Sequence, residues 1–241
     1  MSNSVSNSNK RKTAIITGGT GTIGQALVEI ISKRYDVVFT YLQNKTKAAE
    51  LEHLYNAKSY RCDITDINVS KRIAAKHDCD LLINNAGIAQ IKMFQNLTEL
   101  DWYKMMDVHL TGSFYFTQSV LPNMINKKSG CIINISSVWG LVGSSCEVHY
   151  STAKAGMIGF TKSLAKEVGP SGIRVNCIAP GVIAGNMNNK LSEEERKDLI
   201  EATPLGRLGT GKEVAVAALY LAGAEFVTGQ VLSVDGGFGL G

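Results

Sequence analysis

Long apolar runs are missing from this sequence of 241 residues. No apolar stretch approaches the eighteen or so residues that a membrane span needs, and the opening segment, MSNSVSNSNKRK, lacks the apolar core of a signal peptide. We therefore expect a cytoplasmic protein with no membrane partner. Residues 1–10 are mostly Ser and Asn, which bury too little apolar surface to offset the entropy of ordering, so we expect a disordered N-terminal tail.

The sequence also lacks a large excess of either basic or acidic residues. The chain has 25 basic and 21 acidic residues, and three of the basic ones, Lys10, Arg11 and Lys12, lie together near its start. Removing these three leaves 22 basic against 21 acidic residues. A domain so close to neutral lacks the excess of positive charge that binds nucleic acid, so we expect no nucleic-acid partner.

Cysteine is sparse, and its spacing suggests no pairing. The five cysteines are an odd number without a C-x-x-C pair, and three of them lie in or beside expected strands. This pattern is typical of buried free thiols in a reducing compartment. We expect no metal site.

Short β-branched segments alternate with helical patterns along the chain. This alternation predicts a single doubly wound α/β domain over residues 11–241, with a parallel sheet and helices on both faces. The expected strands are 12–17, 36–41, 58–62, 80–84, an apolar run from 132, 172–178 and 231–234. The expected helices start near residue 23 and lie at about 45–55, 66–76, 98–120, 150–168 and 212–221. Thr98 with Asp101 predicts the start of one helix, and Ser192 with Glu195 is a capping box that predicts a further short helix.

The stretch IINISSVWGLVGSSCEVHYSTAK concentrates side chains that can do chemistry. Tyr150 and Lys154 are one helical turn apart, so they share a face of a helix that begins there. An adjacent ammonium favours the phenolate, so we expect Lys154 to lower the pKa of Tyr150. Ser137, at the end of the apolar run, is placed to hydrogen-bond a carbonyl or alcohol oxygen. The spacing alone is not specific, because Tyr41 and Lys45 share it and an amphipathic helix start also explains it.

A glycine-rich turn, TGGTGTIG, follows the first expected strand and precedes a helical apolar pattern. Glycines let the backbone approach a pyrophosphate, and a helix N-terminus supplies unpaired N–H groups and a positive dipole end. Strand, glycine turn and helix together predict a dinucleotide site.

These features, together with the run Asn84-Asn85-Ala86-Gly87 after another strand, resemble the short-chain dehydrogenase/reductase family over roughly residues 12–237. The resemblance implies hydride transfer between a nicotinamide and a carbonyl or alcohol. Tyr150 would pass the proton, Ser137 would polarise the oxygen and Lys154 would also hold the nicotinamide ribose. The implied cofactor contacts are Gly18, Thr20, Gly21, Thr22, Ile23, Gly24, Asp63, Ile64, Asn85, Ala86, Gly87, Tyr150, Lys154, Pro180, Gly181 and Ile183.

The chain departs from the family pattern at three positions. Thr22 stands where the common motif has glycine, and the middle glycine is Gly21. His109 stands where the family usually has an asparagine that holds a water near the active-site lysine. We expect it to hold that water, and to repel Lys154 when it gains a proton at acid pH, or else to be a core histidine bound to a backbone carbonyl. Gly185 stands where a threonine is frequent, which leaves one cofactor contact open.

The end of the second expected strand carries no acidic residue. An acid there would bind the adenosine ribose hydroxyls and disfavour a 2′-phosphate. The chain instead reads TYLQNKTK, with lysines at 45 and 47. We therefore expect NADPH and NADP+ as cofactor, the other interpretation of the lysines being an ordinary solvated helix start.

Within the family, NISSVWG and the C-terminal segment look most like 3-oxoacyl-acyl-carrier-protein reductases. The resemblance implies a small-molecule or carrier-protein-bound carbonyl substrate, a substrate lid over about 184–206 and a homotetramer. Lys127 and Lys128 are candidates for contact with an acidic carrier protein. Two alternatives stay open: a dehydrogenase of a free sugar, polyol or steroid, and a non-catalytic nucleotide-binding subunit, against which the retained serine, tyrosine and lysine argue.

Overall fold

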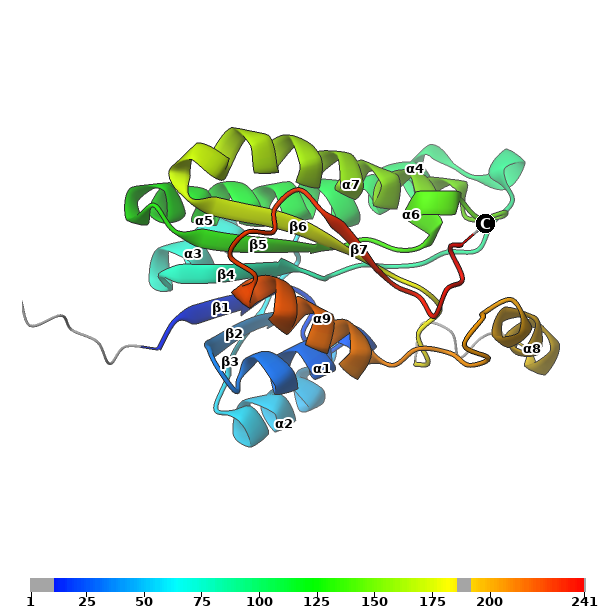
Figure 1. Cartoon of the computed structure of the whole chain (residues 1–241), viewed down its shortest axis with the longest axis horizontal. Coiled ribbons are helices and arrows are strands. Elements are labelled where there is room, and N and C mark those ends of the chain that lie inside the picture. Colours follow the sequence, from blue (N-terminus) through cyan, green and yellow to red (C-terminus); the bar gives the residue numbers. More distant parts are fainter. Residues whose placement is uncertain (1–10, 186–191, 241) are drawn as a thin grey trace, which may run out of the picture.

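A computed structural model describes residues 11–185 and 192–240. Within these residues, seven parallel strands form one sheet in the order β3-β2-β1-β4-β5-β6-β7, with helices on both faces (Figure 1). The order runs outward in both directions from β1 and β4, which is the doubly wound arrangement and confirms the predicted fold class. The strands are β1 (Thr13–Ile16), β2 (Asp36–Tyr41), β3 (Lys58–Arg61), β4 (Cys79–Asn84), β5 (Gly130–Ile135), β6 (Ile173–Pro180) and β7 (Val231–Val234).

The central strands are buried on both faces. From β1, Ala14 and Ile16 enter the core on one face of the sheet, whereas Ile15 enters the core on the other face. A strand covered on both sides reads as a continuous apolar run, as these do. The helices are α1 (Thr22–Ile31), α2 (Lys45–Tyr55) and α9 (Gly211–Gly223) on one face, and α3 (Ile67–Lys76), α4 (Glu99–Met106), α5 (Gly112–Lys127) and α7 (Val148–Val168) on the other.

The helix expected over 98–120 is interrupted and longer than expected. A π-helical turn, Asp107–Thr111, separates α4 from α5, and α5 continues to Lys127 with Pro122 inside it. The expected end near Val120 is therefore wrong. A proline normally stops a helix because it lacks an N–H group and clashes with the preceding turn, but here the helix continues through it. The wide turn carries His109.

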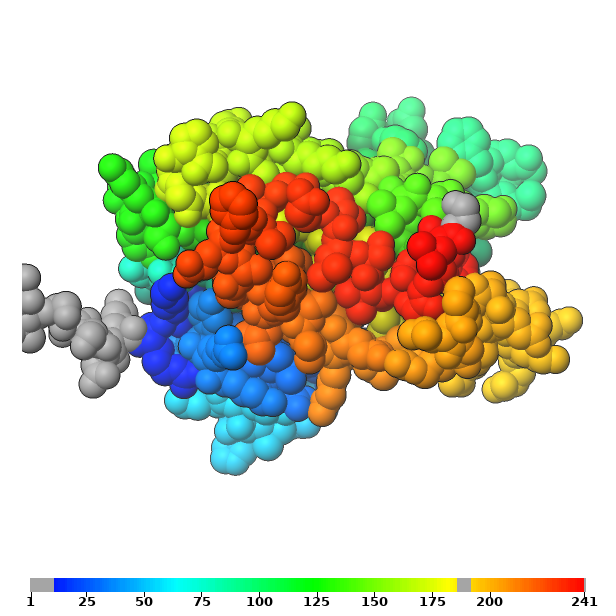
Figure 2. Space-filling view, viewed as in Figure 1, coloured from blue at the N-terminus to red at the C-terminus, as the bar shows by residue number. Residues whose placement is uncertain are grey.

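A further short helix, α8 (Glu193–Glu201), stands out from the body at one end of the molecule (Figures 1 and 2). It begins at the predicted capping box, in which the Ser192 hydroxyl accepts from the Glu195 N–H and the Glu195 side chain accepts from the Ser192 N–H. Residues 186–191 of the expected lid and the expected tail 1–10 fall outside the described residues, so both stay predictions. The remaining short elements are α6 (Trp139–Val142), η1 (Phe94–Asn96) and η3 (Gly169–Ser171).

All five cysteines are free thiols, and Cys62, Cys79, Cys131 and Cys177 are buried, which confirms the expected pattern for these four. Burial raises the pKa of the Cys79 thiol to about 12, so it stays protonated. In the described part of the chain, no helix combines the length and the apolar character needed to cross a membrane.

Candidate active site

The candidate catalytic side chains meet beyond the carboxyl end of β5. Ser137 follows β5, and Tyr150 and Lys154 lie on the first turns of α7. All three are buried, with exposed fractions of 7%, 8% and 4%. The Lys154 Nζ donates a hydrogen bond of 2.8 Å to the Ile135 carbonyl and lies 5.6 Å from the centroid of the Tyr150 ring. The strand end and the helix thus bring the three side chains together.

Burial governs the pKa values in this cluster. It raises the pKa of Tyr150 to about 12, while the Ser137 hydroxyl acts in the opposite direction. Burial also lowers the pKa of Lys154 to about 8. The expected lowering of the Tyr150 pKa by Lys154 is therefore wrong for this structure, because the loss of hydration outweighs the attraction of an ammonium that is directed at the Ile135 carbonyl. At neutral pH Tyr150 keeps its proton, as a proton donor must.

His109 lies beside Tyr150 and is 2% exposed. Its Nε2 lies 2.8 Å from the Ile88 carbonyl oxygen and 3.2 Å from the Ile88 nitrogen, and it donates to the carbonyl in the tautomer that carries the proton on Nε2. Burial, followed by the positive charge of Lys154, holds the pKa of His109 well below its ordinary value. This direction argues against the predicted acid-side titration, because burial and the charge of Lys154 both disfavour the imidazolium. The structure favours the other interpretation, a core histidine bound to a backbone carbonyl.

The glycine turn is held against the end of β4. The Thr17 hydroxyl accepts from the N–H groups of Asn85 and Ala86 at 2.9 and 3.0 Å, and the Asn85 amide donates to the carbonyls of Thr17 and Gly18. Gly18 has a φ of +69°, and a Cβ there would lie 2.8 Å from the Ala86 Cα. A Cβ on Gly24 would collide with the Gly18 carbonyl. Only glycine fits these two positions.

The neighbouring segments fit a dinucleotide. Gly21 precedes α1 without a side-chain cap, so the first N–H groups of that helix face the turn. The Val138 N–H donates to the Pro180 carbonyl at 2.8 Å, and the Gly181 N–H donates to Val234 at 3.0 Å. The segment after β6 is therefore anchored beside the residues that follow β5, at the carboxyl edge of the sheet where open α/β folds bind ligands.

A family model described as Enoyl-(Acyl carrier protein) reductase matches residues 20–239. The chain belongs to the short-chain dehydrogenase/reductase family. The 3-oxoacyl-acyl-carrier-protein reductase FabG of Aquifex aeolicus is 40% identical over 239 residues, which cover 94% of this chain and 96% of that protein. The uncharacterized oxidoreductase YmfI of Bacillus subtilis is 36% identical over 94% of this chain and 98% of its own. A crystal structure of a putative gluconate dehydrogenase from Agrobacterium tumefaciens superposes with a TM-score of 0.91 at 27% identity, covering 95% of this chain and 96% of the other.

The resemblance to the family implies that Asp63 contacts the adenine amino group of the cofactor and that Ile64 packs on the adenine ring. The Asp63 carboxylate accepts from the N–H and the hydroxyl of Thr65 at 3.0 and 2.7 Å, which orients it. Ile64 is buried, and a Cβ on Gly112 would lie 2.6 Å from its Cδ1. The ring stacking implied for Ile64 therefore stays a prediction.

A polar network beside α7 was not visible in the sequence. The fully buried His149 has its Nε2 3.1 Å from the Gln90 Oε1, and the Gln90 amide donates to Asp101 at 2.8 Å. Lys92 pairs with the same carboxylate at 2.7 Å. The sequence showed only that Thr98 and Asp101 cap a helix, which the capping box confirms. The network ties the segment after β4 to the start of the catalytic helix.

Lys127 is held in ion pairs with two aspartates. Its Nζ lies 2.8 Å from a carboxylate oxygen of both Asp78 and Asp80 and donates to the Cys79 carbonyl. These partners lie at the amino-terminal edge of the sheet, whereas Ser137 follows the carboxyl end of β5. The expectation that Lys127 and Lys128 contact an acidic carrier protein stays a prediction, and the charge of Lys127 is already shared with two carboxylates.

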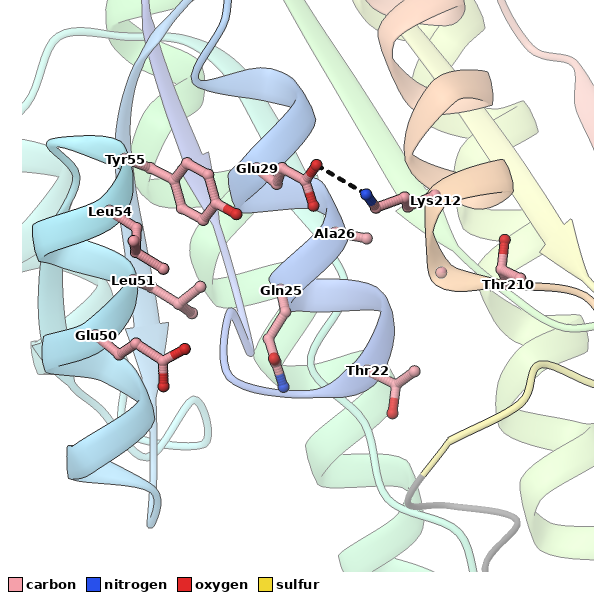
Figure 3. A pocket seen from close by; sticks show the side chains of 11 residues that line it. Thr22, Gln25, Ala26, Glu29, Glu50, Leu51, Leu54, Tyr55, Thr210 and Lys212 are labelled. Atoms are coloured by element: carbon pink, nitrogen blue, oxygen red, sulfur yellow. Dashed lines mark ion pairs between the residues drawn. The ribbon is translucent and has the colours of Figure 1, made fainter.

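An open groove of about 380 Å³ lies between α1, α2 and the start of α9 (Figure 3). The Glu29–Lys212 ion pair, 3.0 Å long, lies in it, and its lining includes Gln25, Leu51 and Tyr55. Of the predicted cofactor contacts, only Thr22 reaches its lining. The groove is thus separate from the catalytic cluster.

Proposed function

We propose that this chain is an NADP(H)-dependent reductase that converts a carbonyl to an alcohol, and that its substrate is a 3-oxoacyl group on acyl-carrier protein. The observation that carries the proposal is the buried assembly of Ser137, Tyr150 and Lys154 beside a glycine turn. The 40% identical relative from Aquifex aeolicus, which is named a 3-oxoacyl-acyl-carrier-protein reductase, supports the choice of substrate.

Each catalytic residue has a distinct task in the proposed reaction. When bound, the nicotinamide supplies the hydride that reaches the carbonyl carbon. Tyr150 gives its phenol proton to the carbonyl oxygen, and the Ser137 hydroxyl donates a hydrogen bond to that oxygen as negative charge develops on it. Lys154, held by the Ile135 carbonyl, stabilises the phenolate that the proton transfer leaves behind.

The proposed preference for NADP(H) rests on the surroundings of the end of β2. Thr40 is buried and its hydroxyl accepts from the Gly18 N–H at 3.2 Å, so this strand end lies directly against the glycine turn. The exposed Arg61, whose Nε donates to the Leu42 carbonyl at 3.2 Å, supplies a cation that the sequence pattern missed. Lys47 is paired with Glu50. We therefore assign the 2′-phosphate to Arg61 and to Lys45 rather than to Lys47.

An aromatic wall favours an acyl chain over a sugar. Trp139 packs against the cluster that contains Tyr150, and its ring lies 5.2 Å from that of Phe238 in an edge-on arrangement. Contact between these two rings and the methylene groups of an acyl chain would be favourable, because it removes apolar surface from water. A polyol would instead bury hydroxyl groups there without hydrogen-bond partners. This contact supports an acyl substrate over the sugar that the name of the gluconate dehydrogenase neighbour suggests.

The experiment is a substrate screen with both nucleotides. A 3-oxoacyl thioester is presented on acyl-carrier protein and on a short pantetheine analogue, and gluconate and free ketoses are offered beside them, with NADPH and NADH compared. We expect the highest kcat/KM with the carrier-bound thioester and NADPH. Higher kcat/KM with a free sugar would contradict the substrate, and no turnover of any carbonyl would favour the non-catalytic alternative.

We also propose a cytoplasmic homotetramer. Several of the exposed apolar side chains lie in two separate regions, and a tetramer with two kinds of twofold interface would cover both regions. One region lies on α4 and α5, and the other on and after α9 beside the edge strand β7. They comprise Leu100, Tyr103, Phe114 and Ile125 in the first, and Val216, Tyr220 and Phe226 in the second.

A further inference from the structure

His149 directly precedes Tyr150 on α7, and its side chain is fully buried. Its Nε2 lies 3.1 Å from the Gln90 Oε1, and the Gln90 amide donates to the Asp101 carboxylate at 2.8 Å. Hydrogen bonds from Lys92 and Gln90 hold the pKa of Asp101 below its ordinary value, so this ionised carboxylate can only accept. The amide nitrogen of Gln90 therefore faces Asp101 and its oxygen faces His149, which must donate from Nε2.

The imidazole of His149 is held as a neutral donor. Its Nδ1 is buried and has no hydrogen-bond partner among the described residues. A proton on Nδ1 would be buried without an acceptor, which is costly, and burial lowers the pKa of His149. The side chain thus has one clear task, which is to hold the Gln90 oxygen.

Gln90 belongs to the segment after β4, residues 88–97, and this segment is tied to the region before α7 a second time. The Lys92 N–H donates to the Cys146 carbonyl at 2.8 Å, and the Lys92 side chain pairs with Asp101 at 2.7 Å. Figure 1 shows the segment, in teal, at the end of the molecule where α6 lies and α7 begins. Two of its residues are therefore anchored beside the start of the catalytic helix.

The segment presents three exposed apolar side chains, which we call the apolar rim. The exposed fractions are 68% for Ile91, 55% for Met93 and 65% for Phe94. Exposure alternates, with Gln90 and Lys92 half-buried and Ile91 and Met93 exposed, as in an extended chain whose successive side chains face opposite ways. The hydrogen bonds that bury Gln90 and Lys92 thus also fix where the apolar rim points.

We propose that His149 is a positioning residue, which holds Gln90 so that the apolar rim contacts the acyl chain of the substrate beyond its reacting carbonyl. The inference rests on the proposed function, the reduction of a 3-oxoacyl thioester at Tyr150. The anchors Cys146 and His149 lie within four residues of Tyr150, which brings the rim within reach of a hydrocarbon chain attached to that carbonyl. Contact with the chain removes apolar surface of both partners from water.

The dependence on chain length tests this role. KM and kcat are measured for 3-oxobutanoyl and 3-oxododecanoyl thioesters of one pantetheine analogue at saturating NADPH, and the wild-type protein should have the lower KM for the longer chain. In Gln90→Ala and His149→Phe, KM for the longer chain should rise about 10-fold, the scale of one lost hydrogen bond. Values for the shorter chain should stay unchanged. Gln95→Ala, at an exposed glutamine of the same segment, is the matched control.

A rescue variant and an exchange measurement separate positioning from a general loss of stability. His149→Gln carries an amide N–H of similar reach and should restore the KM for the longer chain. Hydrogen exchange over residues 88–97 should be faster in His149→Phe than in the wild type or in His149→Gln, because the segment opens more often. Unchanged exchange, or an equal loss of activity for both chain lengths, would overturn the positioning role.

The apolar rim is tested directly by Phe94→Ser. This exposed substitution should raise KM for the longer chain alone, whereas Leu54→Ser, at an exposed leucine on α2, should change neither KM. An unchanged KM in Phe94→Ser, together with an altered sedimentation velocity, would show that the rim contacts a second copy of the chain and would overturn its role in acyl binding.

The outcomes distinguish this inference from the proposed function. A wild-type protein with equal KM for both thioesters would refute the acyl contact and leave the reductase proposal intact. A wild-type protein that reduces neither thioester would refute the proposed function and the acyl contact with it, while the hydrogen-exchange comparison would still show whether His149 holds the segment.

Discussion

The imidazole of His109 meets the Tyr150 ring edge-on, with 5.4 Å between the ring centroids and an angle of 83° between the planes. The Ile88 carbonyl fixes the imidazole through Nε2, and a Cβ on Gly87 would lie 2.5 Å from its Cε1. His109 is thus held by the residues that follow β4, and it in turn supports the phenol. This makes it a positioning residue for Tyr150 rather than a proton carrier.

The first prediction follows from the neutrality of His109. Its pKa is held well below the ordinary value, so lowering the pH through the usual histidine range adds no charge beside Lys154. The His109→Asn variant should therefore keep the same acid limb in its pH–rate profile, measured at saturating cofactor. His53→Asn, at an exposed histidine near the end of α2, is the control. Loss of an acid limb in His109→Asn alone would show that His109 titrates after all.

Tyr150→Phe tests the proton donor. The variant keeps the ring that meets His109 but loses the hydroxyl, so turnover should fall by about 10² to 10⁴. Binding of NADPH, followed by fluorescence, should change little. Tyr103→Phe, at an exposed tyrosine on α4, should leave both quantities unchanged. Turnover close to that of the wild type in Tyr150→Phe would show that Tyr150 is not the proton donor.

Much of the fold was predictable because its signals are local. The apolar strands, the glycine turn and the capping boxes at Thr98 and Ser192 each lie within a few residues, and the structure places them as expected. The end of α5 was predicted too early, near Val120, whereas the helix continues through Pro122 to Lys127; a proline inside a helix is tolerated only where the surrounding packing supports it.

The candidate site was predictable only in part, because its energetics depend on burial. The sequence placed Tyr150 and Lys154 on one helix face, but it could not show that both would be desolvated, which reversed the expected direction of the Tyr150 pKa. Contacts between distant segments were equally hidden. Thr22 meets Gly185 across 163 positions of sequence, and no local pattern announces that contact.

Lys154 sets the alkaline limit of the proposed reaction. Its pKa is lowered by burial from 10.5 to about 8, so the ammonium is present below pH 8 and is lost as the pH rises through that value. Reductase activity should decline there, because a neutral amine no longer stabilises the phenolate of Tyr150. In Lys154→Arg the guanidinium stays charged, so the decline should disappear even if the rate is lower. An unchanged alkaline limb in that variant would assign the titration to another group.

The exposed apolar regions predict how the assembly can be dissociated. Tyr220→Glu places a carboxylate in the region on α9, and sedimentation velocity should then show dimers in place of tetramers, because burying an unpaired charge at an interface is costly. Leu54→Glu, at an exposed leucine on α2 outside both regions, should leave the tetramer intact. A wild-type protein that sediments as a monomer at micromolar concentration would refute the proposed assembly.

Arg61 should decide the choice between NADPH and NADH. Arg61 is the last residue of β3 and lies opposite Tyr41, the last residue of β2. Its side chain donates a hydrogen bond to the Leu42 carbonyl. Arg61→Ala should weaken NADPH binding by about 10-fold, the scale of a lost charged hydrogen bond, and leave NADH binding unchanged, because only NADPH carries the 2′-phosphate.

The control for Arg61 lies on the same strand. Lys58→Ala removes an exposed cation from the opposite end of β3 and should change neither affinity. Tyr41→Asp should go further than Arg61→Ala, because a carboxylate at the end of β2 repels the 2′-phosphate and accepts hydrogen bonds from the ribose hydroxyls of NADH. Equal loss of NADPH and NADH affinity in Arg61→Ala would mean that Arg61 holds the Leu42 segment in place, and the phosphate would then have to be assigned to Lys45 alone.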